Sequence, residues 1–394
     1  MAEARAAWIT GVGIVSCLGE GPDAHWQRLS EGKPAADTQA FAPYVVHPIA
    51  PIELDKQIPK KGDQRQMEPW QRIGTYAAGL ALDAAGAKGN AALLARMDMI
   101  VAAGGGERDY AADGAILTGL PKSNNPGAYL NERLMSDLRP TLFLAQLSNL
   151  LAGNISIVHG VTGSSRTFMG EEAAGVDAVR IALARITAGT SDIVLVGGAH
   201  NGERKDLLML YEFAGLNLRD KYAPVWARGP KGGFALGSLG AFLMIEEKAH
   251  ALARGAKPLA RLTTVLSDRS RREAGAVTSA LRKMWGKLPP ATDGQAIISG
   301  ATGAEPATKE ERAFLAEHAE VPVRATGSYI GHGFEPQFPM NVALAAIAVN
   351  RGTLFPPGDG SGVERAMDKP LTRVVVTSVG HWRGEGLALV EAAT

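Results

Sequence analysis

Two kinds of hydrophobic pattern alternate along the chain. Short apolar runs closed by glycine are typical of buried strands, and longer Ala/Leu-rich stretches repeat their apolar positions at helical spacing. The strand-like runs are 7–15, 98–105, 155–160, 166–169, 192–198, 240–247, 259–268, 295–300, 322–327, 372–379 and 386–392. The helix-like stretches are 68–86, 140–153, 172–189, 309–319 and 339–351. This alternation predicts an α/β fold.

The helix predicted over 172–189 has an unusual composition. Ala, Val, Ile and Leu surround it on nearly every side, with Asp177, Arg180 and Arg185 as its main polar exceptions. Because a helix that is apolar all round must be covered all round, we expect this one to be mostly buried. The stretch 309–319, in contrast, has the pattern of an amphipathic surface helix.

The strand-like runs fall into two groups. A polar helical connector, 247-EKAHALARGAK-257, lies between them, and the chain is long enough for two domains. We therefore divide the chain into an N-terminal half, residues 1–250, and a C-terminal half, residues 251–394. In the second half, the last two strand-like runs are expected to pair as an antiparallel hairpin.

Composition narrows the possible functions. A formal net charge of +1, without a long basic run, argues against a nucleic acid or an anionic membrane as partner. The apolar runs are too short to span a bilayer and the N-terminus lacks a signal-peptide layout, so a cytoplasmic location is expected. The single cysteine, Cys17, excludes a disulfide framework and is interpreted as a packing residue. The eight histidines show no zinc-site spacing, so no metal is expected.

A series of motifs surrounds a pair of acidic residues. The segment 153–199 contains a strand-like run, the pair Glu171 and Glu172, the apolar helix, and then 189-GTSD-192 and 195-LVGG-198. It resembles, without a gap, the nucleophile region of the elongating β-ketoacyl-ACP synthases of the thiolase superfamily. Similarity to the same family continues in 8–21, 65–86, 232–262, 331–332 and 378–390.

The resemblance implies a fold and an assembly. The family has a five-layered αβαβα thiolase fold built of two similar halves, and its members are normally dimers through the strand before the nucleophile. Their acyl groups arrive on acyl carrier protein, which is therefore an expected partner here. No cofactor is implied.

The nucleophile position holds a carboxylate. In the family, a cysteine at the start of the buried helix is activated by the helix N-terminus and takes the acyl group. The gap-free match places Glu172 at this position. An acyl-glutamate would be a mixed anhydride prone to hydrolysis, so Glu172 cannot replace the cysteine in this chemistry.

The other chemical positions of the family are also altered. Ala301 stands where the family has its first histidine, Gly327 where it has a lysine, and Asn341 where a glutamate orders the site. His332 retains the second histidine, and His381 takes the place of the aromatic residue that gates the acyl pocket. The resemblance thus implies a retained scaffold from which condensation has been lost. Whether the chain is an enzyme stays open.

Glu172 has two interpretations. An unpaired carboxylate at a buried helix start would be unstable, so we expect it to be paired, with His332 as the expected partner. In the structural interpretation, which we favour, this pair fills a retired site, and in the functional one the two act as general base and acid. Glu171 lies about 100° round the helix, so it should face elsewhere, toward a dimer interface or an arginine.

The leading hypothesis is a non-condensing, or chain-length-determining, partner subunit of a competent synthase in fatty-acid or polyketide synthesis. The chain would form a homodimer or a heterodimer, with Phe143 reaching toward the partner's acyl tunnel. Phe334 and His381 are expected to shape or gate the acyl pocket. Bulky side chains from 333–338 filling that pocket would favour a structural partner, and an open tunnel would favour binding or catalysis.

Two alternatives remain. One is altered thioester chemistry, such as a malonyl-ACP decarboxylase or an acyl-ACP hydrolase that uses Glu172 and His332. The other is a conventional synthase whose site residues are matched differently.

Overall fold

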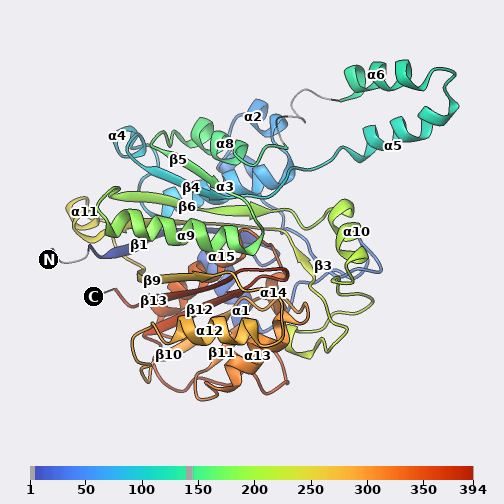
Figure 1. Ribbon diagram of the computed structural model, residues 1–394. Helices are drawn as coiled ribbons and strands as arrows, with labels where there is room; N and C mark the ends of the chain where they lie inside the picture. The colour runs from blue at the N-terminus through green and yellow to red at the C-terminus, as the bar shows by residue number, and fades with distance from the viewer. Residues whose placement is uncertain (1–4, 139–143, 145, 394) are drawn as a thin grey trace.

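Two groups of five strands form the centre of the molecule (Figure 1). The structure is a computed structural model that describes residues 5–138, 144 and 146–393. The first group has the order β1 (Ala7–Ser16), β8 (Leu239–Glu247), β6 (Ile193–His200), β4 (Asp98–Ala102), β5 (Ser165–Phe168). The second has the order β9 (Ala260–Asp268), β13 (Glu385–Glu391), β12 (Arg373–Val379), β10 (Gln295–Ser299), β11 (Val323–Ala325).

The two groups repeat one arrangement. In each, the first three strands pair antiparallel, as β1–β8–β6 and as β9–β13–β12, and the last two join in parallel. A short contact between β1 and β9, at Trp8 opposite Arg261, makes the two groups continuous. The expected pair of similar halves and the closing antiparallel hairpin are therefore confirmed.

Helices complete five layers around and between the strand groups (Figure 1). The central layer consists of α9 (Glu172–Thr187) and α15 (Gln337–Arg351). The outer layers are α3 (Pro69–Ala84) with α8 (Leu150–His159) on the first group, and α12 (Ala276–Trp285) with α13 (Ala307–Ala316) on the second. This is the αβαβα layering that the resemblance implies.

The central helices are apolar because strands cover them on two sides. In α9, the buried positions run from Glu172 and Ala174 to Ile186 and lie on more than one face. In α15, every residue from Gln337 to Val349 is buried. The prediction that the helix over 172–189 is mostly buried is confirmed.

The strand predicted over 155–160 is wrong. Residues 150–159 form α8, in which Leu151 and Ile155 are buried one turn apart while Ile157 is 72% exposed. The β-branched residues of this run favoured a strand in isolation, but burial at helical spacing decides the conformation. Part of the helix predicted over 140–153 lies outside the described residues.

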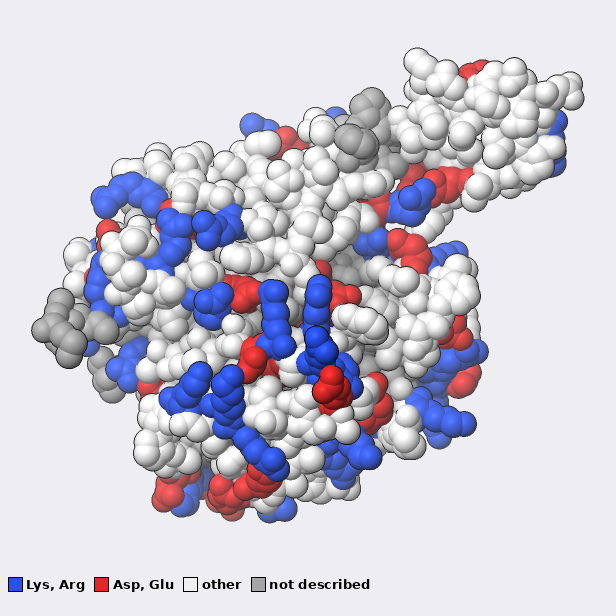
Figure 2. Space-filling model, in the orientation of Figure 1, with Lys and Arg blue, Asp and Glu red and all other residues white. Residues whose placement is uncertain are grey.

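A helical hairpin that the sequence analysis did not predict extends away from the layers (Figure 1). It consists of α5 (Tyr110–Gly119), the turn η2 (Leu120–Lys122) and α6 (Pro126–Asp137). None of the residues in α6 is buried, and apolar side chains are exposed along the hairpin, including Leu117 at 68% and Met135 at 79%. Figure 2 shows that most of its surface on this side carries no charge.

The remaining elements are short. They are α1 (Gly21–Glu31), α2 (Lys61–Gln66), α4 (Ala91–Leu94), α10 (Lys205–Phe213), α11 (Lys248–Ala253), α14 (Gly327–Ile330), β2 (Gly19–Glu20), β3 (Val46–His47), β7 (Leu236–Gly237), η1 (Leu54–Lys56) and η3 (Val225–Ala227). Within residues 5–138, 144 and 146–393, each helix is too short or too polar to traverse a lipid bilayer.

A buried carboxylate joins the elements near the middle of the chain. Glu246, at the end of β8, is fully buried and accepts a hydrogen bond from Thr10 on β1. It also accepts two hydrogen bonds from Arg254, one from Nε and one from Nη2, each at 2.6 Å. His250 lies 2.6 Å from the same carboxylate, and Arg254 also donates to the Ala85 carbonyl. The ion pair therefore ties the first strand and the end of α3 to the connector between the two strand groups.

Replacing Arg254 with methionine should destabilise the fold by about 3–5 kcal/mol, because it leaves a buried charge without its bidentate partner. Urea unfolding measures the loss. Arg282→Met removes a surface partner of Glu317 and should cost far less, because water screens an exposed ion pair. Equal losses in the two variants would contradict the role assigned to the buried pair.

Candidate functional site

The site begins at a sharp turn between β5 and α9. β5 ends at Phe168, Glu171 has φ 58° and ψ −138°, and α9 starts at Glu172. A residue other than glycine rarely adopts a positive φ, so the backbone at Glu171 is strained. Such strain is typical of functional sites. The turn directs the Glu172 side chain, 2% exposed, into the interior at the helix N-terminus.

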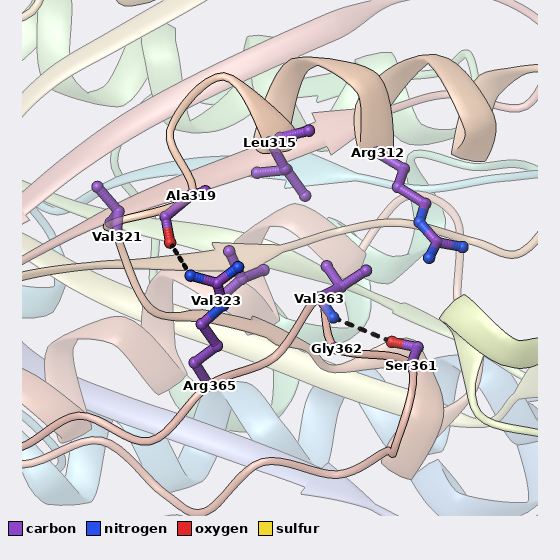
Figure 3. Close-up of a pocket in the computed structure, with 10 residues that line it drawn as sticks. Arg312, Leu315, Ala319, Val321, Val323, Ser361, Gly362, Val363 and Arg365 are labelled. Carbon is purple, nitrogen blue, oxygen red and sulfur yellow. Dashed lines mark hydrogen bonds between the residues drawn. The ribbon is translucent and has the colours of Figure 1, made fainter.

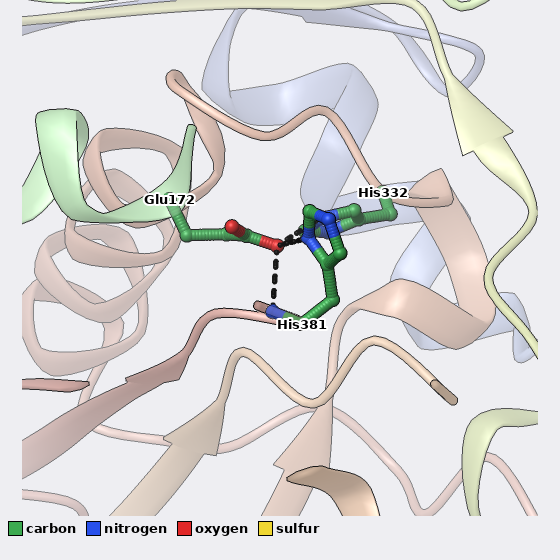
Figure 4. A group of neighbouring side chains, drawn as sticks. All are labelled: Glu172, His332 and His381. Atoms are coloured by element: carbon green, nitrogen blue, oxygen red, sulfur yellow. Dashed lines mark hydrogen bonds and ion pairs between the residues drawn. The ribbon is translucent and has the colours of Figure 1, made fainter. Parts of the chain in front are cut away.

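Glu172, His332 and His381 form a buried cluster (Figure 4). The Glu172 Oε1 atom lies 2.8 Å from His332 Nε2 and 2.9 Å from His381 Nδ1. It also accepts a hydrogen bond from the His381 backbone N–H at 3.2 Å. The other carboxylate oxygen, Oε2, is buried and has no hydrogen-bond partner in the described part of the chain.

Backbone hydrogen bonds hold the two histidines in place. His332 follows α14, and its N–H donates to the Ala235 carbonyl while its carbonyl accepts from the Gly237 N–H. His381 lies in the loop between β12 and β13, which is closed by a hydrogen bond from the Gly380 N–H to the Gly384 carbonyl. Arg272 donates to that loop at the Gly380 carbonyl as well. Both imidazoles are thus presented by loops of the C-terminal half.

Aromatic rings surround the imidazoles. Phe334 has its ring centroid 4.5 Å from that of His332 and 5.6 Å from that of His381. Tyr211 stacks on Phe334 at 5.1 Å, and Phe234 lies 5.3 Å from His332. Phe334 is 2% exposed, so a bulky side chain from 333–338 does pack beside the two imidazoles.

The charges in the cluster follow from these contacts. Burial alone would raise the pKa of Glu172, but the charge of His381 and the hydrogen bonds from both histidines bring it far below its usual value. Burial lowers the pKa of His332, despite its bond to Glu172, whereas the attraction of Glu172 outweighs burial and raises the pKa of His381. These shifts favour the ionised form of Glu172 and the protonated form of His381, and they disfavour the protonated form of His332.

Glu335 is a second buried acid beside the cluster. It is 5% exposed, and burial, together with the neighbouring charges of Glu172 and Glu171, raises its pKa to about 7. Its backbone carbonyl lies so close to Gly175 on α9 that a Cβ there would be 2.2 Å away, so glycine is required at that helical position. The sequence analysis did not single out Glu335 as a titrating group.

A buried arginine connects several loops near the cluster. Arg228 donates to the carbonyls of Thr302, Gly233 and Ala223, and burial lowers its pKa to about 10. Its second Nη lies 3.4 Å from the carbonyl of Gly327. Arg228 precedes a glycine-rich run in a loop, and no sequence pattern predicted this role.

The positions predicted from the resemblance have different surroundings. Ala301 belongs to the buried apolar cluster that includes Val225 and Trp226. The Asn341 side chain accepts a hydrogen bond from Thr326 Oγ1 at 2.7 Å. Phe143 lies outside the described residues. Cys17 donates to the Tyr329 carbonyl at 3.2 Å, and burial raises the pKa of its thiol to about 12, which fits a packing role.

Glu171 faces a cavity next to the cluster. This cavity, of about 450 Å³, is lined by Glu171, His381, Arg272 and Trp382 together with apolar residues of the α10 region. Glu171 Oε1 lies 3.7 Å from His381 Nε2, and burial raises the pKa of its carboxyl. The two acids therefore diverge, as expected, although both of them meet His381.

A separate cavity lies far from this site in the C-terminal half (Figure 3). It has a volume of about 350 Å³ and is lined by residues of α13, β11 and the 361–365 loop, including Arg312 and Arg365. The Arg365 guanidinium donates to the Ala319 carbonyl across it. Its lining includes neither a histidine nor a carboxylate.

The layered scaffold and the turn between β5 and α9 define a thiolase-type fold. A family model described as "Beta-ketoacyl synthase, N-terminal domain" matches residues 5–251. The chain belongs to the β-ketoacyl synthase family.

Two of its relatives illustrate the range of the family. The chain is 25% identical over 269 residues to 3-oxoacyl-[acyl-carrier-protein] synthase 2 of Vibrio harveyi, covering 66% of this chain and 61% of the relative. It is 25% identical over 404 residues to the tetracenomycin polyketide synthase ketoacyl synthase beta subunit of Streptomyces glaucescens, covering 96% and 95%. The match thus spans about three fifths of the first relative and nearly all of the second.

Solved structures show the same fold. The ishigamide ketosynthase/chain length factor superposes with a TM-score of 0.82 at 18% identity, over 100% of both chains. A β-ketoacyl synthase from Burkholderia phymatum gives a TM-score of 0.78 at 18% identity, over 99% of this chain and 100% of the other. The thiolase fold expected from the sequence is confirmed.

Substitution of Glu335 should change the pH dependence of stability. Because the folded-state pKa of Glu335 is raised, its contribution to the free energy of unfolding is fully present below pH 4.5. That contribution is lost as the pH rises through about 7. Between pH 5 and pH 8.5, we expect the free energy of unfolding of Glu335→Gln to rise by about 3 kcal/mol relative to that of the wild type. Urea unfolding at the two pH values measures this difference.

Glu273→Gln is the matched control, because it removes a carboxylate whose side chain is 75% exposed. If both variants change equally with pH, burial of Glu335 is not the cause.

Proposed function

We propose that the chain is a non-condensing partner subunit of a β-ketoacyl synthase in fatty-acid or polyketide synthesis. The observation that carries this proposal is the buried cluster at the nucleophile position. There, Glu172 is held by His332 and His381 where the family's cysteine would stand. The subunit would contribute to the shape of its partner's acyl tunnel and so to product length, while the partner performs the condensation.

The state of Glu172 argues against catalysis. A general base works best when its pKa lies near the operating pH, whereas the contacts of Glu172 hold its pKa far below the usual value. As a nucleophile it would give a mixed anhydride instead of a stable thioester. The Phe334 ring beside His332 also supports a filled pocket over an open acyl tunnel.

Exposed apolar surface supports a protein partner. β5 pairs with β4 on one edge, and within the described residues no strand pairs with its other edge. Ile157 on the adjacent α8 and Met169 after β5 are 72% and 65% exposed, and the α5–α6 hairpin exposes further apolar side chains. A second subunit of the same fold, docking on this edge, would cover this surface.

Comparisons with relatives favour a heterodimer. One similar structure is titled a ketosynthase/chain length factor, and one relative is a ketoacyl synthase beta subunit. Another similar structure holds an acyl-carrier protein in complex with its ketosynthase. We therefore propose a condensing synthase as the second subunit and acyl carrier protein as the partner of the assembled pair.

The isolated chain should neither condense nor decarboxylate malonyl-ACP. Glu172→Cys should stay inactive as well, because a thiol alone does not restore the histidine and lysine missing at Ala301 and Gly327. Product formation from acyl- and malonyl-ACP, followed by mass spectrometry, measures this. Turnover by the wild type that disappears in Glu172→Gln would sink the proposal and establish altered thioester chemistry.

Binding of the condensing subunit should depend on the β5 edge. Ile157→Lys places a charge in the proposed apolar contact and should weaken the heterodimer by at least about tenfold, measured on co-expressed, purified subunits. The control is Leu252→Lys on α11, a 58% exposed leucine on the connector, which should leave affinity unchanged. A homodimer that copurifies with no second synthase would contradict this assembly.

A further inference from the structure

We propose that Glu172, His332 and His381 form a binding site for one divalent transition-metal ion, with zinc as the best-matched metal. Two imidazoles and one carboxylate are a ligand set that zinc and ferrous iron favour. One ligand atom from each residue lies within 4.8 Å of the others, and all three residues are buried. This inference goes beyond the proposed partner role and does not depend on it.

The distances are close to those of a coordination sphere. Zinc ligands at about 2.0 Å from the metal lie about 3.3 Å from one another in a tetrahedral site. The Glu172 oxygen is now 2.8 and 2.9 Å from the two imidazole nitrogens. Side-chain shifts of about half an ångström would therefore admit the ion, which would replace the protons that these atoms now share.

An unpaired oxygen gives independent support. Glu172 Oε2 is buried, and within the described residues it has no hydrogen-bond donor. A buried carboxylate oxygen without a donor is unfavourable, whereas a metal ion can be bound by either oxygen or by both. The cluster therefore offers more acceptor capacity than its hydrogen bonds use.

The surroundings resemble those of known metal ligands. A ligating histidine usually turns its other ring nitrogen toward a carboxylate, and His381 Nε2 lies 3.7 Å from Glu171 Oε1. Phe334, Phe234 and Tyr211 supply an apolar wall around the imidazoles. The cavity of about 450 Å³ that is lined by Glu171 and His381 reaches one of the three ligands and gives an entry path from that side.

Coordination would link distant parts of the chain. Glu172 belongs to the N-terminal half, at the start of α9, and His332 and His381 belong to two loops of the C-terminal half. With three protein ligands on separate segments, the ion would act as a cross-link between the halves at the retired nucleophile position.

The test uses the full-length protein from cells grown with added zinc. Elemental analysis after gel filtration should give about one zinc per chain, and zinc should raise the unfolding midpoint of the metal-free protein by at least about 3 °C. Cobalt(II) should give the visible absorption bands of a low-symmetry site. Zinc far below one per chain, with no shift in the midpoint, would overturn the proposal.

Matched variants locate the ion. Glu172→Gln keeps the side-chain volume, and His332→Phe and His381→Phe keep an aromatic ring without a ligand nitrogen, so each should weaken zinc binding at least about tenfold. His318→Phe, which keeps the ring that stacks on Trp285 at 4.3 Å, should bind zinc as the wild type does. If one of the three ligand variants does not fold, the zinc affinities of the other two test the site. Unchanged zinc binding in the folded variants would place the metal elsewhere. These zinc measurements use the chain without a condensing partner. A negative result would therefore contradict the metal site and would not bear on the proposed partner role.

Discussion

A carboxylate buried at the start of a central helix requires compensation, and the structure around the candidate site follows from that requirement. Taking an ionised Glu172 out of water is strongly unfavourable unless its charge is matched. The helix N-terminus supplies part of the match, and the contacts of the carboxylate with His332 and His381 supply the rest. The conformations of the two histidine loops are thus adapted to one negative charge.

The charge of Glu172 also shapes the packing and the loops around it. Phe334 packs against the ring of His332, which contacts the carboxylate. Arg228 ties together the loops around Thr302 and Gly327 through their backbone carbonyls. Buried polar contacts therefore hold the loops of the C-terminal half in place near the cluster.

The sequence predicted the layers well because buried helices and glycine-closed strands have strong local patterns. It failed at α8, whose β-branched residues favoured a strand, and it missed the α5–α6 hairpin, which buries only Ala112 and Ile116 and so has no continuous apolar face turned to the core. The Glu172–His332 pair followed from the family's geometry. The part played by His381 did not, because the matching family residue is an aromatic that gates the pocket, so the resemblance gave no reason to expect an ion pair there.

Those long separations have a consequence for how the chain reaches its native state. The two imidazoles come from residues 160 and 209 positions after Glu172, so neither is in place until most of the C-terminal half has folded. Before that, the carboxylate at the start of α9 can be buried only in its protonated form. A chain halted midway must therefore leave Glu172 in water, where it is ionised, or bury it with a proton that the native molecule has released.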